Sequence, residues 1–252
     1  MTSILKVSSL HAGYGAGDIL KGIDVELPAG SILTIIGPNG SGKSTLAKTL
    51  AGLLRARQGS IELEGEPLNE LSAPKRVLAG ISYVPQEYNV FRNLTVLENL
   101  KIAREFMGAR GPRDFMGANG KAARGLDDGL EELFPELPKH YRIAAGNLSG
   151  GQRQMLAFAC ALAVRPKLLI LDEPSAGLSP ILTREVFERV ERVNRTGVSI
   201  LMIEQNAIEA LRISHSCVVL SGGRVRACAS AKDVLGMKDL NSFYLGDASN
   251  RI

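Results

Sequence analysis

The chain has 252 residues, of which 45% are hydrophobic and 22% charged, as is typical of a folded globular protein. Thirty basic and 26 acidic side chains leave a net charge of +4, which is too small to indicate nucleic-acid binding by itself. The three cysteines form no CxxC pair, which argues against a disulfide framework or a thiolate zinc site, and the longest apolar run, about 155–164, is half of the roughly 20 residues that a membrane span needs. No secretory signal is visible, so we expect a soluble protein of a reducing compartment that reaches a membrane only through a partner.

The first third of the chain is expected to form β-strands separated by glycine, proline and aspartate. The pattern predicts strands at about 4–10, 19–27 and 31–37, and shorter ones at 59–65 and 81–86. The 19–27 run alternates apolar and polar residues near its end, as a half-buried antiparallel strand does. The 31–37 run is nearly all apolar, which indicates a strand covered on both faces, and a helical pattern follows at 46–54.

The rest of the chain is mainly helical in the middle and alternates between helices and strands at the end. Between about 94 and 129, a glycine-rich segment contains FMGA twice, at 106–109 and 115–118; we interpret it as a duplication in a surface loop, with a docking element as the alternative. Helices are then expected at 150–164, 181–194 and 207–213, strands at 168–173 and 199–204, and a hairpin with a Gly222–Gly223 turn at 217–229. This alternation predicts an α/β fold with a parallel sheet covered on both faces.

A phosphate-loop pattern, G-x-x-x-x-G-K-[ST], is matched by GPNGSGKS at 37–44, between a buried strand and a helix. Gly40 and Gly42 let the backbone curl so that successive N–H groups face phosphate oxygens, and the helix that begins near Lys43 adds its positive end. Lys43 would reach the β- and γ-phosphates, and Ser44 would offer its hydroxyl to Mg²⁺. A glycine-rich turn with an unrelated lysine is the weaker interpretation. The predicted ATP-binding residues of this segment are Gly37, Pro38, Asn39, Gly40, Ser41, Gly42, Lys43, Ser44 and Thr45.

An acidic pair, Asp172 and Glu173, ends the strongly apolar 168–173 strand. In a parallel sheet, ligands bind at the carboxyl ends of the strands, so this pair and the phosphate loop can face one site. Asp172 would hold Mg²⁺, directly or through water, and Glu173 would activate the attacking water. Alone, such a pair is more often a turn or a helix cap, and it is the phosphate loop that favours the catalytic interpretation.

The segment LSGGQ at 148–152 lies one helix upstream of that strand. Ser149 can cap a helix whose first turn holds Gly150 and Gly151, and such a helix end exposes N–H donors to an anion; an ordinary cap is the alternative. With the phosphate loop and the acidic pair, this segment makes nearly the whole chain resemble the ATP-binding subunit of an ABC transporter. Kinases and small GTPases share the phosphate loop but lack LSGGQ.

This resemblance implies a fold and a way of working. The fold is a P-loop NTPase (RecA-like) core with an N-terminal antiparallel β subdomain and an inserted α-helical subdomain. It would be a single domain over 1–252, with the core at 1–90 and 160–252 and the helical subdomain at about 91–159. The activity would be ATP hydrolysis between two subunits that face head to tail and close over two ATP molecules. The residues that grip the γ-phosphate of the other subunit would be Ser149, Gly150, Gly151 and Gln152.

Other positions of the family carry over one at a time. Tyr14 resembles the aromatic residue that stacks on adenine, and Gln86 the glutamine that contacts Mg²⁺ and water and senses the membrane partner. The 175–180 stretch, SAGLSP, resembles the loop that couples the two sites but lacks its usual aspartate. Gln205 replaces the family's switch histidine; it can donate an amide hydrogen bond to a phosphate but cannot carry a proton. Hydrolysis is still expected because Glu173 is present. The expected catalytic residues are Glu173, Gln86 and Gln205, and the expected Mg²⁺ ligands are Ser44, Gln86 and Asp172.

A subfamily is indicated by YVPQ, VFRNLTVLENL, ELFPEL, EQNA and the terminal YLG. These segments resemble one of the two ATPases of branched-chain (hydrophobic) amino acid importers, whose relatives serve amide or urea uptake. The implied partners are a second ABC ATPase (as homo- or heterodimer), two transmembrane permeases and a periplasmic or extracellular solute-binding protein, with no nucleic acid. The implied location is the cytoplasmic face of the inner (plasma) membrane, as a peripheral subunit. Other chains of such importers select the solute, so this sequence does not reveal it.

Two other functions are open to the same motifs. An ABC-type ATPase acting on nucleic acid or ribosomes usually carries two ATPase units or a long coiled coil, and this chain shows neither; its basic clusters are scattered. A degenerate, regulatory nucleotide-binding subunit is the third hypothesis, and it depends on whether Glu173 contributes to hydrolysis.

Overall fold

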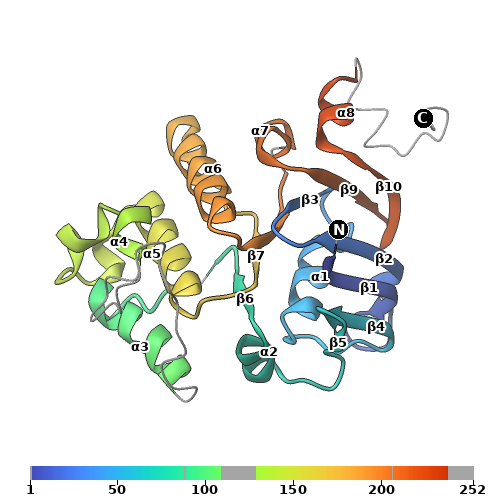
Figure 1. The fold of residues 1–252 in the computed structure, drawn as a ribbon, viewed down its shortest axis with the longest axis horizontal. Helices are drawn as coiled ribbons and strands as arrows, with labels where there is room; N and C mark the ends of the chain where they lie inside the picture. Colours follow the sequence, from blue (N-terminus) through green and yellow to red (C-terminus); the bar gives the residue numbers. More distant parts are fainter. Residues whose placement is uncertain (1, 88, 109–128, 206, 238–252) are drawn as a thin grey trace.

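The computed structural model describes residues 2–87, 89–108, 129–205 and 207–237, and these form two β-sheets and surrounding helices (Figure 1). The FMGA repeat, apart from the helical backbone of 106–108, and the YLG segment lie outside the described residues. An antiparallel sheet has the strand order β2-β1-β4-β5. Its strands are Ser3–Ala12 (β1), Leu20–Pro28 (β2), Gln58–Leu63 (β4) and Glu66–Pro67 (β5).

The second sheet has the order β10-β9-β3-β8-β7-β6. Its neighbouring strands run parallel except for the predicted β9–β10 hairpin, whose turn residues Gly222 and Gly223 both have positive φ. The strands are Ile32–Ile36 (β3), Ile81–Val84 (β6), Leu168–Asp172 (β7), Ser199–Ile203 (β8), Ser216–Ser221 (β9) and Arg224–Ser230 (β10).

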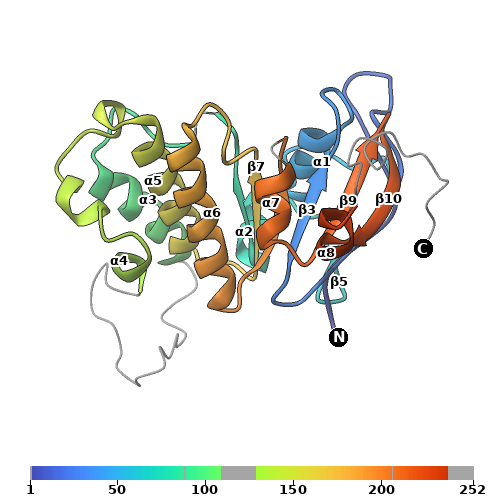
Figure 2. The same cartoon turned by 90° about the horizontal axis from the view of Figure 1, so that it is seen from above.

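The helices separate into groups on either side of the parallel strands. Figure 1 shows α3, α4 and α5 together at the end of the molecule opposite the antiparallel sheet, and Figure 2 shows α6 and α7 beside the parallel strands. No helix among the described residues is both long and apolar enough to cross a membrane. The α-helices are Lys43–Leu50 (α1), Ala73–Ala79 (α2), Val96–Gly108 (α3), Leu130–Leu133 (α4), Gly150–Ala163 (α5), Pro180–Arg195 (α6), Ala207–Ile213 (α7) and Ala231–Leu235 (α8), with 3₁₀ turns at Leu137–His140 and Ala145–Asn147.

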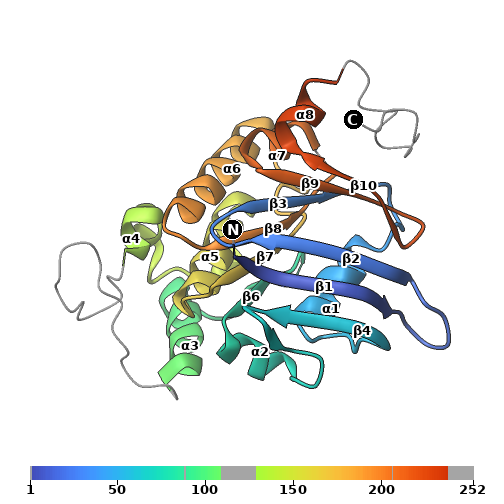
Figure 3. The same ribbon diagram turned by 45° about the vertical axis from the view of Figure 1, so that its right-hand side comes forward.

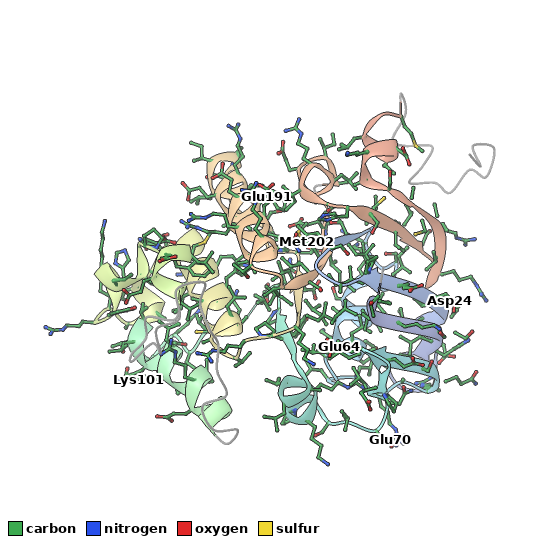
Figure 4. All side chains as sticks on the ribbon, in the orientation of Figure 1. Asp24, Glu64, Glu70, Lys101, Glu191 and Met202 are labelled. Atoms are coloured by element: carbon green, nitrogen blue, oxygen red, sulfur yellow. The ribbon has the colours of Figure 1, made fainter. Side chains whose placement is uncertain are left out.

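The parallel strands are buried on both faces, as predicted for 31–37. In β3, Leu33 and Ile35 belong to the core that faces α1 and the antiparallel sheet, whereas Ile32 belongs to the core beneath α5 and α6. Met202 of β8 lies on the helical side, in the interior of the molecule (Figure 4). Two covered faces explain why these strands are continuous apolar runs and not alternating ones.

The helix that follows the phosphate loop packs between the two sheets (Figure 3). Leu46 and Leu50 of α1 are fully buried in the same core as the inner residues of β1 and β2. The helix begins at Lys43 and ends at Leu50, earlier than the predicted 54, and Gly52 in the turn after it has a φ of +79°. Because both sheets pack against α1, the loop at its start has a fixed support.

The buried side chain of Arg76 forms hydrogen bonds to carbonyl groups at the C-terminal end of α1. It is 2% exposed, and its Nη1 donates to the carbonyl oxygens of Thr49 (2.7 Å) and Leu50 (2.9 Å), while Nε donates to that of Leu71 (3.1 Å). Burial lowers the pKa of the guanidinium group. The last carbonyl groups of a helix lack partners within it, and a cation near that end also interacts favourably with the helix dipole. Arg76 therefore links α2 to the helix that carries the phosphate loop.

Replacing Arg76 with methionine should lower the free energy of unfolding by about 2–4 kcal/mol, because buried carbonyl groups lose the hydrogen bonds that the guanidinium group donates. Urea denaturation followed by circular dichroism measures the change. As a control, Arg55→Met removes an exposed arginine whose contact with Glu70 is 3.8 Å long, and it should change stability by less than about 0.5 kcal/mol. Equal stability of the two variants would contradict the structural role of Arg76.

Candidate active site

The phosphate loop leaves β3 after Ile36 and enters α1 at Lys43. Two of its glycines are required by their surroundings. Gly37 has a φ of +155°, and a Cβ there would lie 2.0 Å from the carbonyl oxygen of Leu220 in β9. Gly42 has a φ of +104°, and a Cβ there would lie 2.9 Å from Leu20 Cδ2. Larger residues at either position would push the loop away from the strands that hold it.

Lys43 and Ser41 provide this loop with groups that can bind an anion. Lys43 is 5% exposed, and its Nζ donates to the carbonyl oxygens of Gly37 (2.8 Å) and Pro38 (3.0 Å). Burial lowers the pKa of the Lys43 amine, against the opposing charges of Glu173 and Asp172. The Ser41 hydroxyl is buried without a hydrogen-bond partner among the described residues. A buried cation and an unsatisfied hydroxyl beside a helix N-terminus would both be satisfied by phosphate oxygens.

The carboxyl ends of β3 and β7 lie at the same edge of the sheet, as their parallel direction predicts, and side chains that follow or end these strands are in contact. Ser44 Oγ donates to Asp172 Oδ1 (3.1 Å), and the hydroxyl of Tyr83 donates to Asp172 Oδ2 (3.0 Å). Burial raises the pKa of Asp172 and these two hydrogen bonds oppose the rise, while burial also raises the pKa of Tyr83. Sequence reasoning gave Tyr83 no role in the site, because its hydroxyl reaches Asp172 only through the pairing of β6 with β7.

The oxygen atoms of Ser44 and Asp172 are suitable ligands for Mg²⁺. They belong to a hydroxyl and a carboxylate, and Mg²⁺ prefers oxygen ligands, usually completing its coordination with waters and substrate phosphate oxygens. No group of three or more His, Cys, Asp or Glu side chains that could hold a metal occurs in the described part of the chain. A site with few protein ligands fits a cation that arrives together with a nucleotide.

Glu173 lies between the two glutamines selected from the sequence. Its Oε2 accepts a hydrogen bond from Gln86 Nε2 (3.1 Å), and its Oε1 accepts one from Gln205 Nε2 (3.0 Å). Gln205 Nε2 also donates to Asn39 Oδ1 of the phosphate loop (2.9 Å). The backbone of Glu173 has a φ of 50°, a left-handed conformation that is uncommon outside glycine and that often marks functional sites. The structure thus brings Glu173, Gln86 and Gln205 together at the loop.

Tyr14 is 52% exposed, in the loop between β1 and β2. Arg57 fixes this loop: its Nη1 donates to Asp18 Oδ1 (2.8 Å), and its Nη2 donates to the carbonyl oxygens of Gly13 and Gly15. Asp18 also contacts His11 Nδ1, and its pKa is lowered by His11 and Arg57. The scattered basic clusters of the sequence include Arg57. Its partners are 39 to 44 residues away in the chain and could not be read from local pattern.

The LSGGQ segment forms the start of α5. Ser149 Oγ accepts a hydrogen bond from Gln152 N (3.3 Å), and Gln152 Oε1 accepts one from Ser149 N (2.9 Å), so that the two residues make a capping box. Gly150 is exposed, whereas Gly151 packs against Leu182 of α6. The helix lies on the other side of β6 and β7 from α1 (Figures 1 and 2). Within one chain, the structure therefore does not place these four residues beside the phosphate loop.

Comparisons with known proteins agree with this arrangement. Residues 20–176 match a family model described as ABC transporter. The high-affinity branched-chain amino acid transport ATP-binding protein BraG of Pseudomonas aeruginosa is 40% identical over 98% of this chain and 100% of its own. The probable branched-chain amino acid transport ATP-binding protein LivF of Archaeoglobus fulgidus is 38% identical over 96% and 99%. The lipopolysaccharide export system ATP-binding protein LptB of Haemophilus influenzae is 30% identical over 97% and 98%.

Solved structures show the same fold. The ADP conformation of MJ1267, an ATP-binding cassette of an ABC transporter, has a TM-score of 0.81 with 27% identity and covers 98% of this chain and 100% of its own. A nucleotide-free ATP-binding cassette from an ABC transporter has a TM-score of 0.80 with 27% identity, covering 96% and 98%. The expected P-loop NTPase core with its antiparallel and helical additions is confirmed. By sequence and by fold, along almost its full length, this chain belongs to the ABC transporter family, as one of its ATP-hydrolysing ATP-binding cassettes.

Proposed function

We propose that the chain is the ATPase subunit of an importer for branched-chain or other hydrophobic amino acids, or for related small solutes such as amides and urea. The supporting observation is the difference in similarity among transport ATPases. Two relatives named for branched-chain amino acid transport are 38–40% identical to the chain, against 30% for one named for lipopolysaccharide export. The same proposal includes a nucleotide-binding core at 1–90 and 160–252 and a helical subdomain at about 91–159.

The phosphate loop would bind the triphosphate of ATP. Backbone N–H groups of residues 39–45, the Lys43 amine and the Ser41 hydroxyl would supply donors to its oxygens, and Tyr14 would offer a ring to the adenine. Ser44, Asp172 and Gln86 would hold Mg²⁺, which neutralises charge on the β- and γ-phosphates.

Glu173 would act as the general base that accepts a proton from the attacking water. Amide hydrogen bonds from Gln86 and Gln205 fix its carboxylate without supplying a charge. Gln205 can donate to a γ-phosphate but cannot accept a proton from it, so proton transfer depends on Glu173. The chain can therefore hydrolyse ATP with glutamine at position 205, because Glu173 accepts the proton.

A second ATPase subunit, identical or related, would complete each site. The N-terminal end of α5 presents the backbone N–H groups of Gly150 and Gly151 between the side chains of Ser149 and Gln152, whose own N–H groups pair in the capping box, but it lies away from its own phosphate loop. In a head-to-tail pair, these donors reach the γ-phosphate held by the other subunit, where charge develops during hydrolysis.

Permeases would dock beside Gln86. A cavity of about 390 Å³ opens there, and its lining includes Leu53, Pro85, Asn89 and Ile102, with Leu53 60% exposed and Ile102 41% exposed. An apolar hollow with exposed large side chains is typical of a protein-binding surface. The partner set is then two transmembrane permeases and an extracytoplasmic solute-binding protein, with the chain on the cytoplasmic face of the membrane.

Replacing Lys43 with alanine should weaken MgATP binding by about tenfold or more, because the phosphates lose a charged donor. Isothermal titration calorimetry with MgATP measures the affinity. The control is Lys75→Ala on α2, an exposed lysine, which should keep the affinity within about twofold. Unchanged affinity in Lys43→Ala would contradict the role of the loop.

Replacing Glu173 with glutamine should slow hydrolysis by about a hundredfold or more while MgATP binding stays within about threefold, because the amide cannot take the proton. The variant should then form an ATP-dependent pair, with itself or with its partner ATPase, detected by light scattering after size exclusion. The exposed Glu185→Gln is the control for loss of charge. An undiminished rate in the assembled complex would instead favour a regulatory subunit.

Deleting the gene should abolish uptake of labelled leucine, acetamide or urea, and the wild-type gene should restore it. A gene that carries Lys43→Ala should not restore uptake, since transport requires bound ATP. Normal uptake of all three solutes in the deletion strain would reject the proposed substrate class.

A further inference from the structure

Glu204 is a buried carboxylate for which the proposed catalytic roles have no use. It directly follows β8, is 2% exposed, and its backbone N–H donates to the carbonyl oxygen of Ile35 (3.2 Å). A buried carboxylate is costly unless donors satisfy it. The donors that surround Glu204 therefore indicate which parts of the molecule it connects.

Ser175 and Gln205 both donate to this carboxylate. Ser175 donates through its backbone N–H to Oε1 (2.9 Å) and through its hydroxyl to Oε2 (2.9 Å). The backbone N–H of Gln205 donates to Oε2 at 3.2 Å. Ser175 belongs to the loop between β7 and α6, and Gln205 to the loop between β8 and α7. The buried carboxylate thus connects the two loops through hydrogen bonds in the interior of the protein.

The same two loops also meet through the site itself. Glu173, two residues before Ser175, accepts the hydrogen bond from the Gln205 side chain (3.0 Å). Together with the peptide backbone, these bonds close a ring that runs from Glu173 through Gln205 and Glu204 to Ser175. The left-handed backbone at Glu173 makes its orientation depend on such surroundings.

We propose that Glu204 is a positioning residue that holds Gln205 and the loop after Glu173 in register, and so keeps Glu173 aligned for hydrolysis. This inference rests on the proposed roles of Glu173 and Gln205. Glu204 acts through these neighbours and touches neither the nucleotide nor the water. It also gives the 175–180 loop, which lacks the family's usual aspartate, a fixed connection to the residue at the switch position.

The variant Glu204→Gln separates this role from mere stabilisation. Its carbonyl oxygen can still accept from Ser175 N, and its amide can donate to Ser175 Oγ, which also accepts hydrogen bonds. In this orientation the amide nitrogen cannot accept from Gln205 N, so the bond to Gln205 is lost while both bonds to Ser175 remain. With the amide flipped, the bond from Ser175 N is lost instead, so either orientation removes one hydrogen bond of the ring. The control for loss of charge is Glu209→Gln on α7, whose carboxylate pairs with Arg212.

With the protein and its partner subunits assembled, Glu204→Gln should lower kcat for ATP about tenfold and leave KM and MgATP affinity within about twofold. Glu209→Gln should keep all three near the wild-type values. A lower melting temperature with kcat within about twofold of wild type would show that Glu204 only stabilises the fold, and would overturn the proposal.

A double-mutant cycle with Gln205→Ala gives the second readout. If Glu204 acts through Gln205, adding Glu204→Gln to Gln205→Ala should lower kcat by less than about a further twofold. Independent, multiplicative losses would overturn the proposal. Should Glu204→Gln fail to fold, Ser175→Ala weakens the ring from its other side, because it removes the hydroxyl bond to Glu204 and keeps the backbone one. A loss of about threefold in kcat at unchanged KM supports the proposal, and no loss overturns it.

Glu173→Gln, assayed alongside, separates this inference from the proposed function. If Glu173→Gln keeps the wild-type rate, the assignment of the general base fails. If it is inactive while Glu204→Gln is fully active, only the positioning role fails.

Discussion

The site depends on the hydrogen bond between Ser44 and Asp172. It joins the first turn of α1 to the end of β7, across two strand pairings from β3. Because the strands between them are parallel and buried on both faces, their carboxyl ends are fixed side by side at one edge of the sheet. The phosphate loop, Asp172 and Glu173 can then lie at one site although the loop and the acidic pair come from segments far apart in the sequence.

Packing around α1 maintains this geometry. The helix is enclosed by both sheets, and Arg76 satisfies the carbonyl groups at its far end. The glycine at position 37 lets the loop lie against the backbone of β9, where a Cβ has no room. The groups that face a phosphate are consequently arranged before any nucleotide arrives, which lowers the cost of ordering them on binding.

Much of this architecture could be predicted from the sequence, because its signals are local. Continuous apolar runs predicted the strands covered on both faces, the Gly222–Gly223 turn predicted the hairpin, and GPNGSGKS marked the loop. The side chains that support the site could not be predicted in this way. Tyr83, Arg57 and Glu204 find their partners 89, 39 and 29 residues away in the chain. Strand order and register create these contacts, and neither can be read from residue spacing.

The left-handed backbone of Glu173 has a consequence for the evolution of this position. Such a conformation costs a non-glycine residue on the order of 1 kcal/mol or more, and here it persists where the Glu173 N–H is tied to the carbonyl oxygen of Ile203 (2.9 Å). Glycine would relieve that cost while removing the carboxylate. Glutamate at position 173 therefore costs stability that glycine would recover, which is the trade-off expected where a side chain is kept for activity.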